Sequence, residues 1–248
     1  MTPEEFSNQY DVLVNSYRRF KAFDSQETLD SLDFDEYEKS LYLTKAQEEV
    51  VLSLYSGRNS SLQSFEETEE LRRYLSELIG WKEEEPIENT SGTPIGIDSS
   101  STFFTLPEDL WFITYEAVNV TKEGKCEGDY DIEVVPVTQD EYHKIKNNPF
   151  RGTNTRRALR LDFSNGLVEI VCKYKVNSYY FRYLKKLSPI VLEDMPNGLT
   201  IGGISKETPC KLHEGLHQRI LERAVEIGIQ SKSWGVSQPT QRRETNRE

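Results

Sequence analysis

The spacing of apolar residues divides the chain into a first part with the period of a helix and a later part with the period of a strand. Near the N-terminus an aromatic-rich stripe recurs at steps of four, three, four and three residues, formed by Phe6, Tyr10, Leu13, Tyr17 and Phe20. Residues at this spacing lie on one face of an α-helix. Thr2 and Glu5 add a capping box around Pro3, a residue suited to the first helical position. The pattern predicts a helix that buries its aromatic face.

A second helical region begins near Phe34 in the sequence. Its apolar positions are interrupted at Thr44, which forms a second capping box with Gln47, so we expect a turn or kink there. The region ends at Gly57, a residue typical of the position just after a helix.

A third helix is predicted between Ser64 and Gly80, where Ser64 and Glu67 provide the cap and leucines recur on one face. Residues 82–101 then lose all periodicity and combine charged residues with turn formers. They predict a linker loop.

The apolar period changes to two after residue 101 and predicts β-strands. The expected strands are Thr102–Leu106, Trp111–Val120, Ile132–Val137, Ala158–Phe163, Leu167–Tyr174 and Tyr179–Leu184. Asn165 and Gly166 form the dipeptide typical of a tight hairpin turn. A short helix is expected over 139–146, and helical spacing returns between Glu214 and Gln230.

These elements predict an α+β fold in which a C-terminal helix completes an N-terminal helical bundle and an antiparallel β region is inserted between them. The expected parts are a helical bundle over 1–81, a linker loop over 82–101, an antiparallel β region over 102–212, a C-terminal helix over 213–230 and a flexible, extended tail over 231–248. The tail is too polar to fold alone.

Charge is distributed unevenly along the 248 residues, which carry 42 acidic and 30 basic side chains and a formal net charge of −12. Residues 1–100 hold 22 Asp and Glu against 9 Lys and Arg, whereas residues 101–248 hold 20 against 21. The acidity therefore belongs to the helical part, where it repels phosphate and argues against general nucleic-acid binding.

The cysteines and the N-terminus indicate a protein of the cytoplasm. Cys126, Cys172 and Cys210 are odd in number and widely spaced, which suits a reducing compartment and predicts no disulfide framework. No apolar stretch is long enough to cross a bilayer, and the first residues lack the pattern of a signal peptide, so no membrane partner is expected.

Residues 213–217 read HExxH, a pattern in which two histidines on a helix share a zinc ion and the glutamate acts as general base. The surrounding sequence argues against zinc, because Ile220 stands where the longer peptidase pattern has glycine and no third histidine follows. Cys210 with His213 and His217 is a second metal hypothesis of the same kind. No nucleophile motif or phosphate-binding loop is present elsewhere, so no catalytic residue, cofactor or metal is predicted.

Two segments are candidates for contact with a partner. The loop 148–157 contains Arg151, Arg156 and Arg157 beside an aromatic residue, so it suits nucleic acid, an acidic protein surface or simply an exposed turn. The strand 179–183 is aromatic on both faces, which suits burial on one face and a protein neighbour on the other. Its candidate contact residues are Tyr179, Phe181 and Tyr183.

Several strings of residues together resemble virion structural proteins of crAss-like bacteriophages. They are residues 34–40, 43–51, 106–110, 136–142, 147–150, 179–183 and 220–226, so the resemblance extends from Thr2 to about Gln230. The chain is similar to the ring proteins of the head-to-tail connector, which stack below the portal of tailed phages.

The resemblance implies a non-enzymatic structural protein that forms a closed ring, commonly of twelve copies, between portal and tail. Its expected partners are other copies, the portal, neighbouring connector or tail proteins, and genomic DNA that passes through the channel without sequence-specific binding. The location would be the head–tail junction of the virion, after assembly in the host cytoplasm. The C-terminal segment 231–248 would dock into the portal, with Trp234 as an anchor and Arg242 and Arg243 as further contacts. The alternatives are a zinc-dependent hydrolase and a soluble adaptor or scaffold outside a virion.

Overall fold

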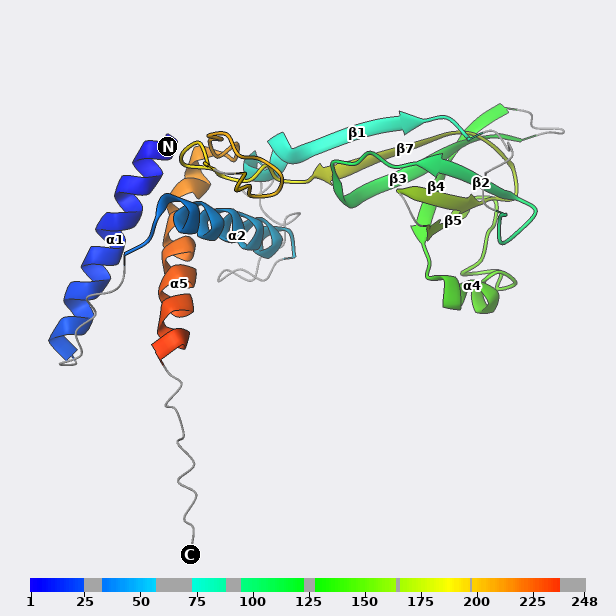
Figure 1. The fold of residues 1–248 in the computed structure, drawn as a ribbon. Coiled ribbons are helices and arrows are strands. Elements are labelled where there is room, and N and C mark those ends of the chain that lie inside the picture. The colour runs from blue at the N-terminus through cyan, green and yellow to red at the C-terminus, as the bar shows by residue number, and fades with distance from the viewer. Residues whose placement is uncertain are drawn as a thin grey trace, which may run out of the picture. The chain divides into compact units, whose positions relative to one another are not determined.

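A computed structural model describes residues 1–24, 33–56, 73–87, 95–122, 128–163, 166–196 and 198–236 (Figure 1). The chain divides into two compact units. Residues 78–186 form the sheet unit, and residues 1–77 together with 187–248 form the helical unit. No helix among the described residues is both long and apolar enough to cross a membrane.

The sheet unit contains one seven-stranded sheet with the order β1-β7-β3-β4-β5-β6-β2. The strands are β1 (Ile79–Glu84), β2 (Ser101–Thr105), β3 (Leu110–Lys122), β4 (Gly128–Pro136), β5 (Arg157–Asp162), β6 (Leu167–Val171) and β7 (Lys175–Lys185). All neighbours pair antiparallel except β4 and β5, which are parallel and are connected through helix α4 (Gln139–Ile145). A parallel pair needs such a crossover because a tight hairpin cannot reverse the chain twice.

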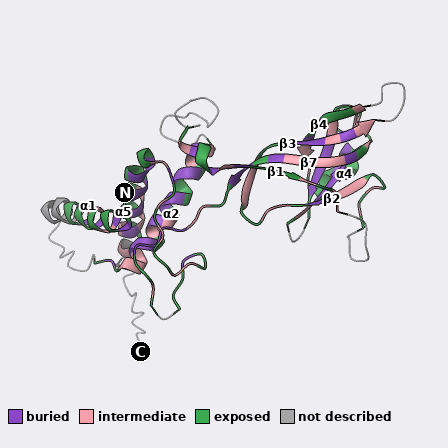
Figure 2. Ribbon diagram, turned by 90° about the horizontal axis from the view of Figure 1, so that it is seen from above, coloured by how far each residue is buried: buried purple, intermediate pink, exposed green. Residues whose placement is uncertain are grey.

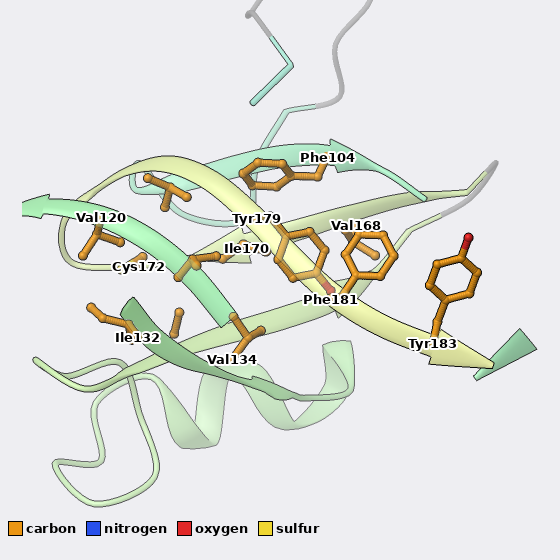
Figure 3. Close-up of a cluster of buried hydrophobic side chains, with 13 residues drawn as sticks. Phe104, Val120, Ile132, Val134, Val168, Ile170, Cys172, Tyr179, Phe181 and Tyr183 are labelled. Carbon is orange, nitrogen blue, oxygen red and sulfur yellow. The ribbon is translucent and has the colours of Figure 1, made fainter. Parts of the chain in front are cut away.

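The sheet curls around its main hydrophobic core (Figure 3). The ring centroids of Phe104 on β2 and Tyr179 on β7 lie 5.4 Å apart. In the strand order, β3, β4, β5 and β6 separate β7 from β2, so the sheet must curve to bring these two rings together. Branched aliphatic side chains of the central strands fill the space between them. A smaller cluster on the other face of β5 and β6 packs against Tyr142 and Ile145 of α4.

The helical unit is organised around α5 (His217–Val236), which follows a short 3-10 turn at Glu214–Leu216. Both α1 (Pro3–Asp24) and α2 (Glu36–Tyr55) pack on α5, and they contact each other far less. Gly228 permits the close approach of α1, since a Cβ atom there would overlap the hydroxyl of Tyr10 and press on the ring of Phe34. Phe6 and Tyr10 of the predicted stripe are buried, and Leu13 and Tyr17 are half-buried. Val14, which the predicted stripe does not include, is buried as well, and the side chain of Phe20 lies outside the described residues.

A polar row on α2 holds an extended segment of the chain that follows the sheet unit. Ser40 accepts a hydrogen bond from the backbone of Leu192, and Gln47 donates one to the carbonyl of Ser188 at 2.8 Å. Between them Thr44 exchanges hydrogen bonds with the backbone of Ile190. These side chains satisfy backbone groups that no sheet partner reaches.

The predicted fold class is wrong: the residues that the structure describes do not form an N-terminal helical bundle that a C-terminal helix completes. The largest regular element is the seven-stranded sheet, and the helices pack around α5 rather than in an N-terminal bundle. The β region is also not wholly antiparallel, because β4 and β5 are parallel. Helical periodicity identified faces that are buried, but it could not show which element buries them.

Several predicted boundaries also differ. Strand β1 begins before and extends into the expected linker 82–101, and Gly80 lies within this strand rather than at a helix end. Helix α2 is unbroken at Thr44, whose hydroxyl binds the backbone of Ile190 instead of capping a helix. Helix α5 continues to Val236, six residues beyond its expected end. Most of the expected third helix, Gly57 and the turn residue Asn165 lie outside the described residues.

Candidate assembly surfaces

Three of the predicted contact residues are core residues. The side chains of Tyr179, Phe181 and Tyr183 all lie on the inner face of β7 and are at most 5% exposed (Figure 3). Their rings follow one another at centroid distances of 4.9 and 5.7 Å. Since the subunit itself buries them, they are not available to a partner, and the prediction is corrected in favour of the opposite face of the strand.

The outer face of the same strands carries an exposed row of three large side chains. Trp81 on β1 lies directly opposite Arg182 on β7, and Tyr115 on β3 lies directly opposite Arg182 on its other side. Trp81 is 76% exposed and Tyr115 is 49% exposed. Tryptophan, tyrosine and arginine are the residues that contribute most often to binding energy in protein interfaces. We call this surface the Trp81 row.

A β-bulge in β3 places Tyr115 in the Trp81 row. Ile113 is opposite Tyr183 and Tyr115 is opposite Arg182, so Thr114 is an extra residue in the pairing. The hydroxyl of Thr114 donates a hydrogen bond to the carbonyl of Arg182 at 3.1 Å. In a regular strand, the side chain of Tyr115 would face the core like that of Ile113 two residues earlier. The extra residue in the bulge shifts this alternation by one position, so the side chain of Tyr115 faces outward.

The Trp81 row continues into a polar surface on the same outer face of β3, β4 and β7. Asn177 donates hydrogen bonds to Asn119 at 3.0 Å and to Thr121 at 2.7 Å. Asn119 in turn donates to Asp131, and Thr121 donates to Asp129. Tyr180 lies between the Trp81 row and this polar surface. Its pKa is raised mainly by burial and further by its interactions with Tyr115 and Asp131. This part of the face is already internally hydrogen-bonded, so the aromatic part is the stronger candidate for a contact.

A buried ion pair crosses the interior of the sheet unit. Arg160 on β5 donates to both carboxylate oxygens of Glu116 on β3 at 2.9 Å, and the hydroxyl of Tyr179 on β7 donates to the same carboxylate at 2.8 Å. Burial raises the pKa of Glu116, which Arg160 and Tyr179 partly oppose. The three side chains connect three strands, and we assign them a structural role because they face the core.

The loop 148–157 is exposed and held by its own hydrogen bonds. Asn148 accepts hydrogen bonds from the backbone of Phe150 and Arg151 at 2.9 and 3.2 Å. Arg157 donates to the carbonyl of Phe150 at 2.7 Å, so its guanidinium stabilises the loop. Arg151 and Arg156 are exposed and remain candidates for a contact. Phe150 is the aromatic residue beside the three arginines, and the sequence did not indicate it as a contact residue. It is 83% exposed.

A groove between α2 and α5 forms a separate surface within the helical unit. Its volume is about 370 Å³, and Val50 contributes a buried apolar side chain to it. Arg223 on α5 binds Glu49 on α2 at 2.7 Å and Glu226 on its own helix at 2.9 Å. Charged residues thus border Val50 on both helices. Figure 2 marks the buried residues of α2 in purple.

The HExxH residues do not form a zinc site. They do not share one α-helix, because residues 214–216 form a 3-10 turn and α5 starts at His217. His213 caps this turn by accepting a hydrogen bond from the backbone of Gly215 at 3.1 Å. The buried His217 has Nε2 2.9 Å from the carbonyl of Leu212 and Nδ1 2.8 Å from the amine of Met1. Among the described residues, no three His, Cys, Asp or Glu side chains lie close enough to hold a metal ion.

The C-terminal contact candidates are only partly within the described residues. The backbone of Trp234 belongs to the last turn of α5. Arg242 and Arg243 lie outside the described residues.

Sequence reasoning missed Trp81, which stands among charged residues at the end of a predicted helix. A lone tryptophan in such polar surroundings was the available signal for an exposed aromatic side chain.

Comparisons with known proteins identify the family. Residues 1–240 match the family described as phage tail ring protein 3/4. The chain is 42% identical over 236 residues to "Ring protein 3" of Bacteroides phage crAss001, covering 94% of this chain and 97% of the relative. It is 30% identical to "Ring protein 4/5" of the same phage, covering 92% of each. The resemblance in the sequence is thereby confirmed: the chain belongs to the phage tail ring protein 3/4 family of crAss-like phages, a family of structural ring proteins.

Proposed function

We propose that the chain forms a ring in the head-to-tail connector of a tailed phage, between the portal and the tail. Twelve copies would surround the channel through which the genomic DNA passes. The ring would assemble in the host cytoplasm and remain at the head–tail junction of the virion. Family membership supports a ring, and the Trp81 row is the observation in the structure that carries the assembly role.

The Trp81 row suits a contact with a neighbouring protein in the connector stack, such as the portal or an adjacent ring. Trp81 and Tyr115 lie on paired strands of a sheet, and the hydrogen-bonded strands fix their positions before binding. A preorganised aromatic surface loses little conformational entropy when a partner covers it. Burial of an aromatic side chain removes roughly 150–250 Å² from water.

The charge of the helical unit supports a position near DNA that is not a DNA-binding role. The helical unit contains 25 Asp and Glu against 16 Lys and Arg, and its excess of acid lies in residues 1–77, which hold 17 against 8. Where such a surface faces the channel, it repels the phosphates and lets the DNA slide. The acidic residues then prevent adhesion during DNA passage rather than forming a binding site.

A structural role needs no catalytic residue. The polar groups that most resemble a catalytic motif, His213 and His217, are engaged in capping and in buried hydrogen bonds. Nδ1 of His213 accepts a hydrogen bond from the backbone of Gly215, and the two ring nitrogens of His217 lie within hydrogen-bond distance of the carbonyl of Leu212 and the amine of Met1. This supports an assembly protein rather than a hydrolase.

The segment 231–248 would serve as the docking arm for the portal, with Trp234 as its anchor and with Arg242 and Arg243 as further contacts. Its first six residues continue α5, where Lys232 lies over the ring of Phe34 and binds Glu38 at 3.2 Å. A chain that ends at Val236 retains these contacts and removes only the rest of the arm. It should fold normally and bind portal more weakly.

The test is co-expression of the chain with the portal and the adjacent connector proteins, followed by electron microscopy and native mass spectrometry. Wild type should yield rings in a stack with the portal. Trp81→Ala should leave the fold intact and reduce incorporation into the stack, because it removes an exposed side chain. Tyr130→Ala is the matched control, since Tyr130 is 47% exposed but is paired with Val120 on the face of the core. Wild-type incorporation of Trp81→Ala would refute the role of the row, and wild-type monomers in the presence of portal would refute the ring.

A further inference from the structure

The loop 148–157 presents Phe150 as a fixed projection. Gly152 is buried, and a Cβ atom there would lie 2.7 to 2.8 Å from the carbonyl oxygens of Asn148, Ile145 and Lys146. The side chain of Asn154 accepts a hydrogen bond from the backbone of Arg156 at 2.8 Å and closes the second half of the loop. The loop therefore holds the backbone of Phe150 in place, so binding needs to order little more than its side chain.

The surroundings of Phe150 are positive in a chain whose net charge is −12. No Asp or Glu occurs from Tyr142 to Leu161. Lys144, Lys146, Arg151 and Arg156 are all exposed in this segment. An aromatic side chain with cationic neighbours fits an apolar site that has carboxylates at its rim.

The α2–α5 groove in the helical unit is lined mainly by charged side chains, with more carboxylates than guanidinium groups, and Val50 is the one apolar residue among them. Its volume of about 370 Å³ exceeds the roughly 150 Å³ of a cavity that accommodates benzene. Three carboxylates, those of Glu49, Glu222 and Glu226, and two guanidinium groups border it. Arg223 is already bound to Glu49 and Glu226. Glu222, which accepts a hydrogen bond from Gln218, and Arg219 have no ion pair with another described residue, so the groove carries one more carboxylate than guanidinium groups.

We propose that Phe150 of one subunit inserts into the α2–α5 groove of a second copy of this chain. Phe150 would lie in the part of the groove around Val50, and Arg151 would bind Glu222 at the rim. The proposal rests on the ring of the proposed function and names its copy-to-copy contact. The loop belongs to the sheet unit and the groove to the helical unit, so each subunit carries both halves of a heterologous contact, which is the type of contact that closes a ring.

Cysteine pairs test this contact directly. Ser53 lines the groove, so a chain with Phe150→Cys and Ser53→Cys should form a ladder of disulfide-linked multimers under mild oxidation. Two chains with one change each should yield only covalent dimers when mixed, because each has half of the contact. The control combines Phe150→Cys with Ser16→Cys. Ser16 is an exposed serine on α1 whose hydroxyl donates to the carbonyl of Val12, as the hydroxyl of Ser53 donates to the carbonyl of Val50. The control and the wild type, which retains the native cysteines, should form no ladder.

Charge reversal provides an independent readout without changing the core. Arg151→Glu or Glu222→Arg alone should raise the concentration for half-assembly at least about tenfold, because like charges then face each other. The double variant should restore assembly.

The failures are distinguishable. Wild-type rings without a ladder in the Phe150→Cys, Ser53→Cys chain would overturn this contact and leave the ring intact. Monomers for wild type and all variants, with and without portal, would refute the ring itself. Loss of duplex DNA binding in Arg151→Glu, with no ladder from the cysteine pair, would assign the loop to DNA and overturn the proposal.

Discussion

The sheet unit is continuous in sequence from Leu78 to Lys186, whereas the helical unit joins residues 1–77 to residues 187–248. The sheet unit can form all its strand pairs from one stretch of chain. In the helical unit, the hydrogen bond between Ser40 and Leu192 connects residues that are 152 positions apart. Its packing around α5 therefore requires that the chain beyond the sheet unit has been synthesised.

The two units also differ in what their interiors contain. The sheet unit encloses the Glu116–Arg160 ion pair, whose loss would leave a charge in a buried place. The helical unit also buries one charged side chain, Lys39, but its partners Asp11 and Glu36 are partly exposed, and the rest of its interior is mainly aromatic and aliphatic with His217 at one end. Only the sheet unit therefore encloses both members of an ion pair, and we infer that matched charges matter more in its interior and close packing matters more in the helical unit. Each prediction below tests this difference, and hydrogen exchange read separately on β7 and α5 reports the stability of each unit.

Arg160→Met should have the largest effect. It leaves the carboxylate of Glu116 buried without its cation, which costs about 3–5 kcal/mol. Exchange should increase in the sheet unit and remain unchanged in α5. The double variant Arg160→Met, Glu116→Leu should recover most of the stability, because apolar pairs of similar volume replace buried ion pairs at little cost. A double variant as unstable as the single one would show that packing, rather than charge, dominates this interior.

Leu221→Ala should destabilise the helical unit by about 2–5 kcal/mol, since Leu221 is fully buried on α5 and its truncation leaves a cavity. Exchange should increase in α1, α2 and α5 and stay constant in β7. Val12→Ala is the control, because Val12 is 63% exposed on α1 and its loss should change stability little. Equal loss of protection in both units would mean that they unfold together.

Asp35→Ala should cost the helical unit about 1 kcal/mol. Asp35 accepts a hydrogen bond from the backbone of Glu38 at 2.7 Å, and Glu38 reaches back to the backbone of Asp35, which completes a capping box. Chemical denaturation should detect the difference, and Asp35→Ser should retain most of the stability because serine also caps helices. A loss that serine does not restore would contradict the capping role.

The two units should respond to pH in opposite directions through one residue each. Burial lowers the pKa of His217 from 6.5, so its contribution to the helical unit is present above that pH and is lost as pH falls through the lowered pKa. Burial raises the pKa of Glu116 from 4.5, so its contribution to the sheet unit decreases as pH rises through the raised pKa. Hydrogen exchange measured from pH 4 to 8 gives the pH dependence of the stability of each unit. The dependence read on α5 should disappear in His217→Gln, and the dependence read on β7 should disappear in Glu116→Gln. Unchanged slopes in the variants would assign the pH dependence to other groups.

Sequence patterns found much of the secondary structure. The stripe from Phe6 to Tyr17, the strands around Val118 and Ile170 and the C-terminal helix are all present, because each has a long run of one period. Strand β1 was missed because Trp81 and its charged neighbours show no alternation at the sheet edge. Only pairing with β7, about 100 residues later, makes this segment a strand.

The contact residues were harder to predict than the elements. Arg151 and Arg156 are exposed as expected, but Tyr179, Phe181 and Tyr183 face the core. The alternation of side chains along a strand shows which residues share a face, but it does not show which of the two faces points into the core. Arg182 stands on the same face as Tyr180, and a charged residue there was the signal that this face is the outer one.

The sequence by itself determined where most of the helices and strands form, that acidic residues accumulate in the first part of the chain, and that the chain resembles the ring proteins. Tertiary structure alone decided that α5 organises the helices, that the bulge at Thr114 turns Tyr115 outward, and that Glu116 meets Arg160 inside the sheet. The physical reason is that periodicity reflects burial over a few neighbouring residues. Strand order, bulges and buried partners depend on contacts between residues tens to hundreds of positions apart, and local patterns do not encode which of these contacts form.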